Sequence, residues 1–429
     1  MSAEPVTVPA GRRAGGRLRV PPSKSVTHRL VNLTLLARGP AVLERPLLAE
    51  DTRLFFAALA RCGFTVAERG DEVALTPGPP PAADEEIEIF CGNAGTMLRF
   101  LVASLTVVPG RFLLDGVDRL RERPVGPLVE ALRRLGAQID YLGTEGFVPL
   151  RIVGATLQGG TTQLAAAESS QYLSALLMAA LRAPGEVTVE VEALTSRPYV
   201  DVTLAAAASV DGQIERLGPR TFRVRPSELR AGRLRVEGDF SAACYPAGAA
   251  ALTGGQVVLE GLFEDSKQGD RLFFNLLADM GAEVGWRKGR LAVRGRELRG
   301  LKADLSDMPD QVPTLAALAP FAQGETLIYN VEHLRIKESD RLEAMAAELR
   351  KLGAEVREGR DSLWIPGLWN ASPPPTEAVS VDPHGDHRIA MSLALVGLRR
   401  PGVSIASPHV VSKSYPDFWR DFSKILTSE

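Results

Sequence analysis

The chain has 429 residues, enough for two or three domains, and its 45% hydrophobic and 24% charged content is typical of a globular protein. Its 50 basic and 52 acidic residues give a net charge of −2, which argues against a nucleic-acid partner because proteins that bind along the nucleic-acid backbone usually carry a basic excess. No apolar run is long enough to span a membrane, so we expect no membrane partner either.

One pattern recurs six times along the chain, at a period of about 70 residues. An apolar stretch with helical periodicity runs into a glycine, and a β-branched stretch follows. The six glycines are Gly39, Gly110, Gly185, Gly255, Gly324 and Gly402. The stretches before the glycines, such as PTLAALAPFAQG, are apolar on nearly all sides and therefore predict buried helices.

A second helix, amphipathic this time, follows most copies of the pattern. In LVEALRRLGA the apolar residues Leu128, Leu132 and Leu135 recur at helical spacing. Strand alternation shows in EVTVEVEAL and in GRLAVRGREL. Each copy therefore predicts a helix–strand–helix–strand unit of α/β class, with one helix inside and one at the surface.

Three units per domain place the first domain at residues 21–237 and the second at 1–20 plus 238–429. The sixth copy lacks its closing strands. We expect the N-terminal strands within TVPAGRRAGGRLRV to complete it, which makes the second domain discontinuous.

The buried helices begin at polar sequences that recur at one phase of the repeat. In chain order these are SKS (23–25), NAGT (93–96), SSQ (169–171), GDFS (238–241), PDQ (309–311) and GDHR (385–388). Helix capping alone explains single Ser, Asn and Asp residues at such places.

The loops before the second helices carry cations in five of the six copies. These are Arg123, Arg197, Lys267, Lys337 and Lys413, whereas the first copy has Asp51. A cation before a helix is locally unfavourable because the helix N-terminus already carries positive partial charge. One such lysine is ordinary at a surface, but the set predicts a small ligand with several negative charges. We expect Asp51 to orient a nearby Arg or Lys.

The cysteines bear on the cellular compartment, and the histidines bear on metal binding. Cys62, Cys91 and Cys244 are scattered and lack CxxC spacing, which fits a reducing cytoplasm and predicts a cytoplasmic protein without a disulfide framework. Among the histidines only His384 and His387 are close, and no cysteine at ligand spacing joins them, so we expect no metal site.

Nine motifs, in the same order and at similar spacing, resemble the 5-enolpyruvylshikimate-3-phosphate synthase family. They are PPSKSVTHR, GNAGTMLR, RERP, ESSQY, TSRPYVDVT, MPD, IKESDR, GDHRIAM and SKSYPDF. The resemblance implies a two-domain inside-out α/β barrel with three repeats per domain. It also implies transfer of the enolpyruvyl group of phosphoenolpyruvate to shikimate-3-phosphate, in the pathway to aromatic amino acids.

The resemblance also implies which residues form the site. The catalytic residues are Lys24, Asp310 and Glu338. Shikimate-3-phosphate binds Lys24, Ser25, Arg29, Ser169, Ser170, Gln171, Ser196, Asp310 and Lys337. Phosphoenolpyruvate binds Lys24, Asn93, Gly95, Arg123, Gln171, Arg341, Arg388 and Lys413. The two small molecules are the only expected partners; we expect a monomer that needs no metal and no organic cofactor.

Three positions depart from the family's common pattern. Met97 and Phe100 flank the loop of Gly95 and affect its shape, and His333 replaces an Asn that often helps to bind shikimate-3-phosphate. Gly95 rather than Ala predicts access for glyphosate.

Two alternatives compete with this interpretation. UDP-N-acetylglucosamine enolpyruvyl transferase shares the fold, but it typically has Lys-Asn where this chain has Lys24-Ser25, and a reactive cysteine that RERPVG lacks. A non-enzymatic repeat protein that binds a polyanion would explain the cations but not the acids Asp310 and Glu338. Closure of the two domains around the substrates is expected, because the adduct must be protected from water.

Overall fold

The structure is a computed structural model that describes residues 4–79, 82 and 85–427. The chain divides into two compact units: unit 1 comprises Met1–Pro21 and Gly238–Glu429, and unit 2 comprises Pro22–Glu237. Residues 1–3 and 428–429, at the outer limits of the second predicted domain, lie outside the described residues.

Three helices form the centre of unit 2 and pack against one another. They are α1 (Lys24–Ala37), α3 (Gly95–Ser104) and α6 (Ser170–Ala180). Most of their residues are buried, which explains why their sequences are apolar on nearly all sides. The second helix of each repeat is exposed on one side, as predicted; these are α2 (Glu50–Arg61), α5 (Gly126–Arg134) and α7 (Pro198–Ala208), and a short α4 (Asp118–Arg121) precedes α5.

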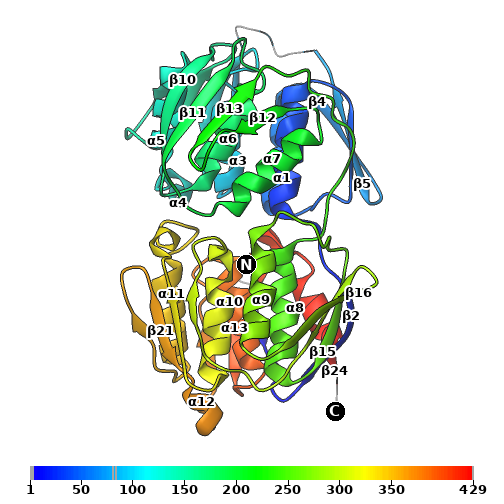
Figure 1. Cartoon of the computed structure of the whole chain (residues 1–429), viewed down its shortest axis with the longest axis vertical. Coiled ribbons are helices and arrows are strands. Elements are labelled where there is room, and N and C mark those ends of the chain that lie inside the picture. The colour runs from blue at the N-terminus through cyan, green and yellow to red at the C-terminus, as the bar shows by residue number, and fades with distance from the viewer. Residues whose placement is uncertain (1–3, 80–81, 83–84, 428–429) are drawn as a thin grey trace. The chain divides into compact units, whose positions relative to one another are not determined.

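Three four-stranded sheets lie outside the helices of unit 2 (Figure 1). In two of these sheets the strands on either side of a buried helix pair in parallel. In the remaining sheet the strand after α1, Ala41–Glu44, pairs in parallel with Gly232–Arg235 from the end of the unit. A hairpin adds two antiparallel strands to each sheet. The first sheet is β14 (Gly232–Arg235), β3 (Ala41–Glu44), β5 (Glu72–Pro77) and β4 (Phe64–Arg69). The second is β6 (Glu86–Phe90), β7 (Arg111–Asp115), β9 (Leu150–Val153) and β8 (Gln138–Tyr141). The third is β10 (Gly160–Ala166), β11 (Val187–Leu194), β13 (Thr221–Arg225) and β12 (Gln213–Arg216).

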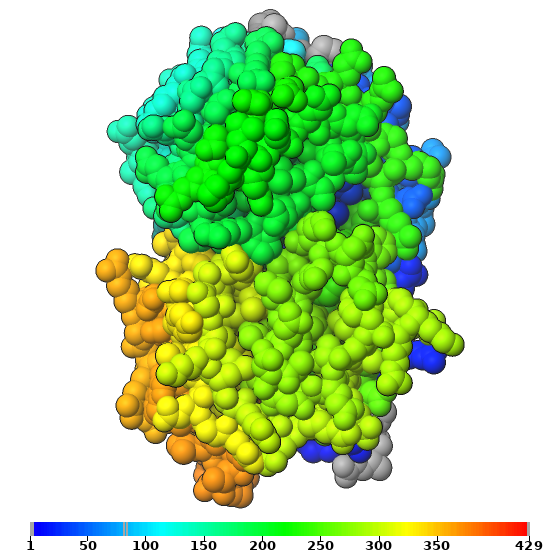
Figure 2. All heavy atoms as spheres, in the orientation of Figure 1, coloured from blue at the N-terminus to red at the C-terminus, as the bar shows by residue number. Residues whose placement is uncertain are grey.

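Unit 1 repeats this plan. Its buried helices are α8 (Phe240–Thr253), α10 (Val312–Leu318) and α13 (His387–Gly397). The other helices are α9 (Phe273–Asp279), α11 (Arg341–Lys351), α12 (Leu368–Ala371) and α14 (Phe418–Ile425), with the 3-10 helices η1 (Gly269–Leu272), η2 (Pro309–Gln311), η3 (Ala319–Phe321), η4 (Glu332–Leu334) and η5 (Pro408–Lys413). Helix α12 protrudes from the surface of its unit, where the space-filling view shows it in orange (Figure 2).

The sheets of unit 1 have five, four and three strands. They consist of β16 (Glu283–Arg287), β17 (Arg290–Arg294), β15 (Gln256–Glu260), β2 (Arg13–Arg19) and β24 (Leu426–Thr427); of β18 (Lys302–Asp304), β19 (Glu325–Tyr329), β21 (Leu363–Pro366) and β20 (Arg357–Glu358); and of β1 (Val6–Thr7), β23 (Val403–Ile405) and β22 (Val379–Val381). The predicted α/β class and the six helix–strand–helix–strand units are confirmed, with helices inside and sheets outside within each unit.

The expectation for the N-terminal strands was partly wrong. Strand β1 does pair with β23 in the sheet of the sixth repeat. Strand β2 instead lies parallel to β15 in the sheet of the fourth repeat, where it takes the place of the strand that precedes a buried helix. In β2 the buried Ala14 and Leu18 face the core while the arginines are exposed, as expected for a strand with one face covered. β2 lies between β15 and β24, and the repeat in the sequence does not reveal this position.

At Gly255, one of the six repeated glycines, close packing explains why the residue is glycine. A Cβ added there would lie 1.8 Å from the carbonyl oxygen of Ala14, so no other residue fits where the chain passes from α8 into β15. At this turn the repeated glycine therefore allows two backbone segments to approach each other closely.

Candidate active site

The three buried helices of unit 2 begin at the same end of that unit. Ser104 Oγ donates a hydrogen bond of 2.9 Å to Asn32 Oδ1, which joins α3 and α1 at similar depths below their first residues. Gln171 Nε2 donates to Thr96 Oγ1 over 2.9 Å, which joins the first turns of α6 and α3. Helix starts carry N–H groups without helical partners, so three neighbouring starts favour an anionic ligand.

Ser23 and Ser169 cap two of these helices. Ser23 Oγ accepts from Val26 N and Ser169 Oγ accepts from Gln171 N. The third helix differs from the capping prediction, because Ala94 rather than Asn93 stands at the N-cap of α3 and makes no side-chain cap bond. The N-cap residue of α3 therefore offers no side-chain acceptor to the N–H groups of the first turn.

Gly95 and Arg123, two predicted phosphoenolpyruvate residues, lie in direct contact. A Cβ on Gly95 would lie 2.5 Å from Arg123 Cζ, so the guanidinium occupies the space that a side chain would take. Arg123 Nη1 also donates to the carbonyl oxygen of Asn93 over 3.5 Å, and the Arg123 side chain is buried. The structure therefore brings Asn93, Gly95 and Arg123 together at the start of α3.

Lys24 is the first residue of α1 and has a carboxylate beside it. Its Nζ lies 3.2 Å from Asp51 Oδ2, and Asp51 stands in the first turn of α2 rather than in the loop before it. An acid in a first turn is favourable with the helix dipole. The expectation that Asp51 orients a nearby cation is consistent with this ion pair.

Arg29 lies inside unit 2. Its guanidinium donates to Thr203 Oγ1 over 2.8 Å and to the carbonyl oxygens of Ser25 and Tyr199 over 2.9 and 2.8 Å. Burial lowers the pKa of Arg29 to about 10. Because these bonds already engage the guanidinium, its predicted role in binding shikimate-3-phosphate stays a prediction.

The three helix starts of unit 1 are joined by buried polar contacts. Asp270 accepts hydrogen bonds from Ser241 at the start of α8 and from Gln311 Nε2, at 3.2 Å, at the start of α10. Arg388 at the start of α13 donates from Nη2 to Asp310 Oδ2 over 2.6 Å. These contacts place the starts of α8 and α13 next to the start of α10.

Arg341 connects the predicted acid–base residues. It is 2% exposed and donates to Asp310 Oδ1 over 2.8 Å and to Glu338 Oε2 over 3.0 Å. A third bond of 2.7 Å reaches Asp386 Oδ2. Burial alone would lower the pKa of Arg341, but the charges of the three carboxylates raise it above its ordinary value. The guanidinium thus stays charged, and it holds Asp310 and Glu338 through two of its nitrogens, Nη1 and Nη2.

His333, whose role the sequence left open, is buried near this cluster. Burial lowers its pKa to about 4, with Lys337 lowering it further and Asp310 opposing. Within the part of the chain that the structure describes, its Nε2 atom has no hydrogen-bond partner. The ring is therefore neutral at pH 7.

The predicted residues divide between the units. Unit 2 holds Lys24, Ser25, Arg29, Asn93, Gly95, Arg123, Ser169, Ser170, Gln171 and Ser196; unit 1 holds Asp310, Lys337, Glu338, Arg341, Arg388 and Lys413. Ser196 has a left-handed backbone with φ of 53°, uncommon for a residue with a side chain and typical of functional turns.

Sequence reasoning missed three buried residues. Arg99 Nη1 donates to Gln171 Oε1 over 2.7 Å, and Asp386 caps α13 and pairs with Arg341. Asp270 joins two helix starts. Arg99 and Asp386 stand inside quoted motifs, so their positions were a usable signal; Asp270 follows DSKQG, and only its place before a helix marks it.

No helix within the described residues is long and apolar enough to cross a membrane. Among the same residues, no group of three or more His, Cys, Asp or Glu is arranged to hold a metal ion.

Known proteins similar to this chain cover almost its whole length. Residues 8–422 match the family described as EPSP synthase (3-phosphoshikimate 1-carboxyvinyltransferase). The 3-phosphoshikimate 1-carboxyvinyltransferase of Syntrophobacter fumaroxidans is 46% identical over 413 residues, which cover 95% of this chain and 96% of that protein. The enzyme of the same name from Vibrio vulnificus is 39% identical over 422 residues, covering 97% of each.

Solved structures agree with the sequence match. An EPSP synthase from Acinetobacter baumannii superposes with a TM-score of 0.82 at 27% identity, covering 98% of this chain and 97% of that one. The enolpyruvyl transferase NikO from Streptomyces tendae, at 19% identity and a TM-score of 0.79, shares the fold. On the family match and on relatives this similar over nearly their full length, the chain belongs to the EPSP synthase family, the 3-phosphoshikimate 1-carboxyvinyltransferases.

Proposed function

We propose that this chain transfers the enolpyruvyl group of phosphoenolpyruvate to the 5-hydroxyl of shikimate-3-phosphate and releases phosphate. Family membership supports this activity. The observation that carries it at the level of residues is the position of Arg341, which binds Asp310 and Glu338 with one guanidinium. Acid–base catalysis of an addition–elimination needs two such carboxyl groups held in fixed positions.

Both substrates are phosphorylated carboxylates, so the site must hold about four anionic groups. For phosphoenolpyruvate we assign Lys24, Asn93, Gly95, Arg123, Gln171, Arg341, Arg388 and Lys413. For shikimate-3-phosphate we assign Lys24, Ser25, Arg29, Ser169, Ser170, Gln171, Ser196, Asp310 and Lys337. The buried arginines suit carboxylate and phosphate because guanidinium binds both with paired hydrogen bonds, while the helix starts offer backbone N–H groups.

The reaction proceeds in two steps. The oxygen of the 5-hydroxyl bonds to C2 of phosphoenolpyruvate, the hydroxyl proton leaves, and C3 takes up a proton to become a methyl group. In the second step the methyl group loses a proton, the bond from C2 to the phosphate oxygen breaks, and phosphate leaves with that electron pair. The product is an enolpyruvyl ether.

We assign the hydroxyl proton to Asp310, assisted by Lys24, and the methyl proton to Glu338. Asp310 is the carboxylate that two arginines hold, through bonds of 2.8 Å from Arg341 and 2.6 Å from Arg388. Because both of its oxygens accept such bonds, Asp310 is fixed in position for a proton transfer that depends on geometry.

The assignments draw on both units, so the proposal requires that the two units contribute to one substrate site and that they close on it. Small-angle scattering tests this requirement. The radius of gyration should fall when shikimate-3-phosphate is added, and an unchanged radius would count against closure. A cytoplasmic location and a monomeric state belong to the same proposal.

Deuterium incorporation tests the addition–elimination chemistry. When the reaction runs in D2O, C3 takes up a deuteron in the first step and the methyl group then loses H or D. The vinyl group of the product, and of phosphoenolpyruvate recovered part-way, should therefore carry deuterium, as mass spectrometry can measure. Product formed without any deuterium at C3 would exclude the adduct.

A further inference from the structure

The outer face of the five-stranded sheet in unit 1 has a floor of small residues. Across the strands, Gly285 pairs with Ala292, and Ala292 pairs with Val258. Val258 in turn pairs with Arg17 on β2. Paired residues on neighbouring strands point to the same face, and these are exposed or half-buried. Small side chains in the middle and long ones around them leave a hollow on this face.

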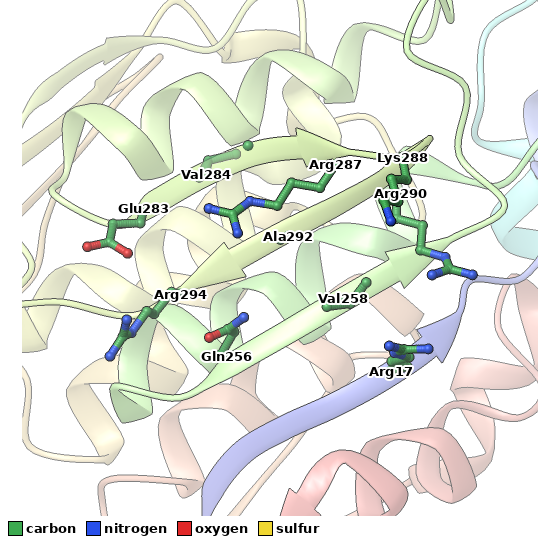
Figure 3. Close-up of a pocket in the computed structure, with 11 residues that line it drawn as sticks. Arg17, Gln256, Val258, Glu283, Val284, Arg287, Lys288, Arg290, Ala292 and Arg294 are labelled. Carbon is green, nitrogen blue, oxygen red and sulfur yellow. The ribbon is translucent and has the colours of Figure 1, made fainter.

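The hollow has a volume of about 450 Å³, within the range of small-molecule sites. Figure 3 shows Glu283 and Arg294 at one end of it and Lys288 and Arg290 at the other. The Arg287 side chain extends over the face beside β17, and Arg17 comes from the neighbouring β2 (Figure 3).

Positive charge dominates the rim of this hollow. The acid among its lining residues, Glu283, pairs with Arg296 at 2.6 Å. Of the lining cations, Arg290 pairs at 2.9 Å with Glu260, which is not itself a lining residue. In the described part of the chain, no salt bridge joins a carboxylate to any of the four remaining cations, which are Arg17, Arg287, Lys288 and Arg294.

The rim also brings like charges together. Arg287 on β16 stands directly opposite Arg290 on β17, and Lys288 follows in the hairpin turn. Like charges at opposed positions destabilise a sheet. A bound polyanion would remove this repulsion.

The exposed arginines on two sheets of unit 2 differ from those at the hollow in having acidic partners. In the first sheet of unit 2, Arg233 on β14 pairs with Glu44 on the adjacent β3 and with Glu72 on β5, the next strand along. In the third sheet of unit 2, Arg223 and Arg225 both pair with Glu186 and Glu215. On these two sheets the exposed arginines thus pair with nearby acids, whereas four cations at the hollow in unit 1 do not.

We propose that this hollow binds a polyphosphorylated small molecule of the size of a nucleoside triphosphate. Guanidinium groups bind phosphate with paired hydrogen bonds, and four cations match a chain of phosphates better than a single one. The flat floor of Gly285, Ala292 and Val258 accepts the planar base. None of the residues assigned to the two substrates lies on this sheet, so the site is separate from the catalytic residues.

Titration calorimetry on the whole protein tests the proposal, with ATP and inorganic tripolyphosphate as probes and with saturating shikimate-3-phosphate present. Wild type should bind ATP more tightly than tripolyphosphate. The double variant R287A/R294A should bind ATP at least about tenfold more weakly. The matched control R223A/R225A, which removes two exposed arginines that have acidic partners, should bind as wild type does. Both should release phosphate at the wild-type rate.

A second variant tests the floor. Ala292→Leu fills the hollow and should weaken ATP binding while tripolyphosphate binding stays unchanged. The proposal is overturned if wild type binds neither probe, if R223A/R225A weakens binding as much as R287A/R294A does, or if shikimate-3-phosphate with phosphoenolpyruvate displaces the ATP. Equal affinity for ATP and tripolyphosphate would overturn the assignment of the floor to the base.

Discussion

Lys24 Nζ lies 3.2 Å from Asp51 Oδ2, and both side chains are largely withdrawn from water. Lys24 opens α1, where a cation is disfavoured by the helix dipole, and Asp51 lies in the first turn of α2, where an acid is favoured. The repeat that has Asp51 in place of a cation thus supplies a carboxylate that pairs with Lys24, the lysine to which we assign a catalytic role. We propose that Asp51 acts through Lys24, as a positioning residue.

Asp51→Asn should therefore impair catalysis more than folding. Without the carboxylate charge Lys24 loses its fixed orientation, and kcat/KM for shikimate-3-phosphate should fall by about 10-fold to 100-fold. Steady-state kinetics and thermal unfolding of the same preparations check this. Glu50→Gln, which removes an exposed carboxylate from the same helical turn, should leave kcat/KM unchanged. Wild-type kinetics in Asp51→Asn would contradict the positioning role.

Gly95→Ala should weaken phosphoenolpyruvate binding. The new Cβ would lie 2.5 Å from Arg123 Cζ, so the guanidinium must move away from the place where we assign the substrate. We expect KM for phosphoenolpyruvate to rise about tenfold, with a smaller change for shikimate-3-phosphate. Gly218→Ala, where a Cβ meets nothing within 4 Å, is the control. Equal effects on both substrates would show that the change acts through folding instead.

Asp310→Asn should lower kcat by at least about 100-fold, because the amide cannot accept the hydroxyl proton. Asp310 also neutralises Arg341 and Arg388, so thermal unfolding must accompany the kinetics. Asp201→Asn removes another carboxylate that pairs with an arginine, at 2.6 Å from Arg216, but on the surface, and should keep full activity. Near wild-type turnover in Asp310→Asn would refute the assigned base.

Asp270 predicts a pH dependence of stability. Burial, and then the charge of Asp310, raises the pKa of Asp270 to about 6. An unfolded aspartate has a pKa of about 3.9, so between these values the folded protein holds a proton that the unfolded chain has lost, and stability falls as the pH rises. The asparagine of Asp270→Asn does not titrate, so the variant lacks this contribution to the pH dependence of stability.

Urea unfolding at pH 4, 5, 6 and 7 measures this effect. Relative to wild type, the free energy of unfolding of Asp270→Asn should increase between pH 4 and 7 by on the order of 2–3 kcal/mol. Asp201→Asn, exposed on the surface, should show no comparable trend. A constant difference between Asp270→Asn and wild type at all four values would show that Asp270 does not titrate in this window.

The repeat made much of the fold predictable. Helices apolar on all sides can only be buried, and so the sequence of α8 or α13 already specifies its place. The strand that pairs with β2 was not predictable from the sequence. The alternation of apolar and charged residues in Arg13–Arg19 is compatible with the sheet of the fourth repeat and with that of the sixth. Strand pairing between distant segments depends on packing that periodicity does not encode.

The site was predictable in its residue types and less so in its contacts. Lys24 and Arg341 stand in motifs, but their carboxylate partners Asp51 and Asp386 come from other segments, 27 and 45 residues away. Asp270 has no motif of its own and was missed, although it joins two helix starts. Contacts of this kind follow from how the buried helices pack, which only the structure shows.

Phosphate release from phosphoenolpyruvate, measured with two alternative acceptors, tests the central claim most directly. Purified protein should release phosphate when shikimate-3-phosphate is present and should show only background release with UDP-N-acetylglucosamine. Asp310→Asn should reduce the first rate to near background. Release with UDP-N-acetylglucosamine alone, or no release with either acceptor, would contradict the proposed function.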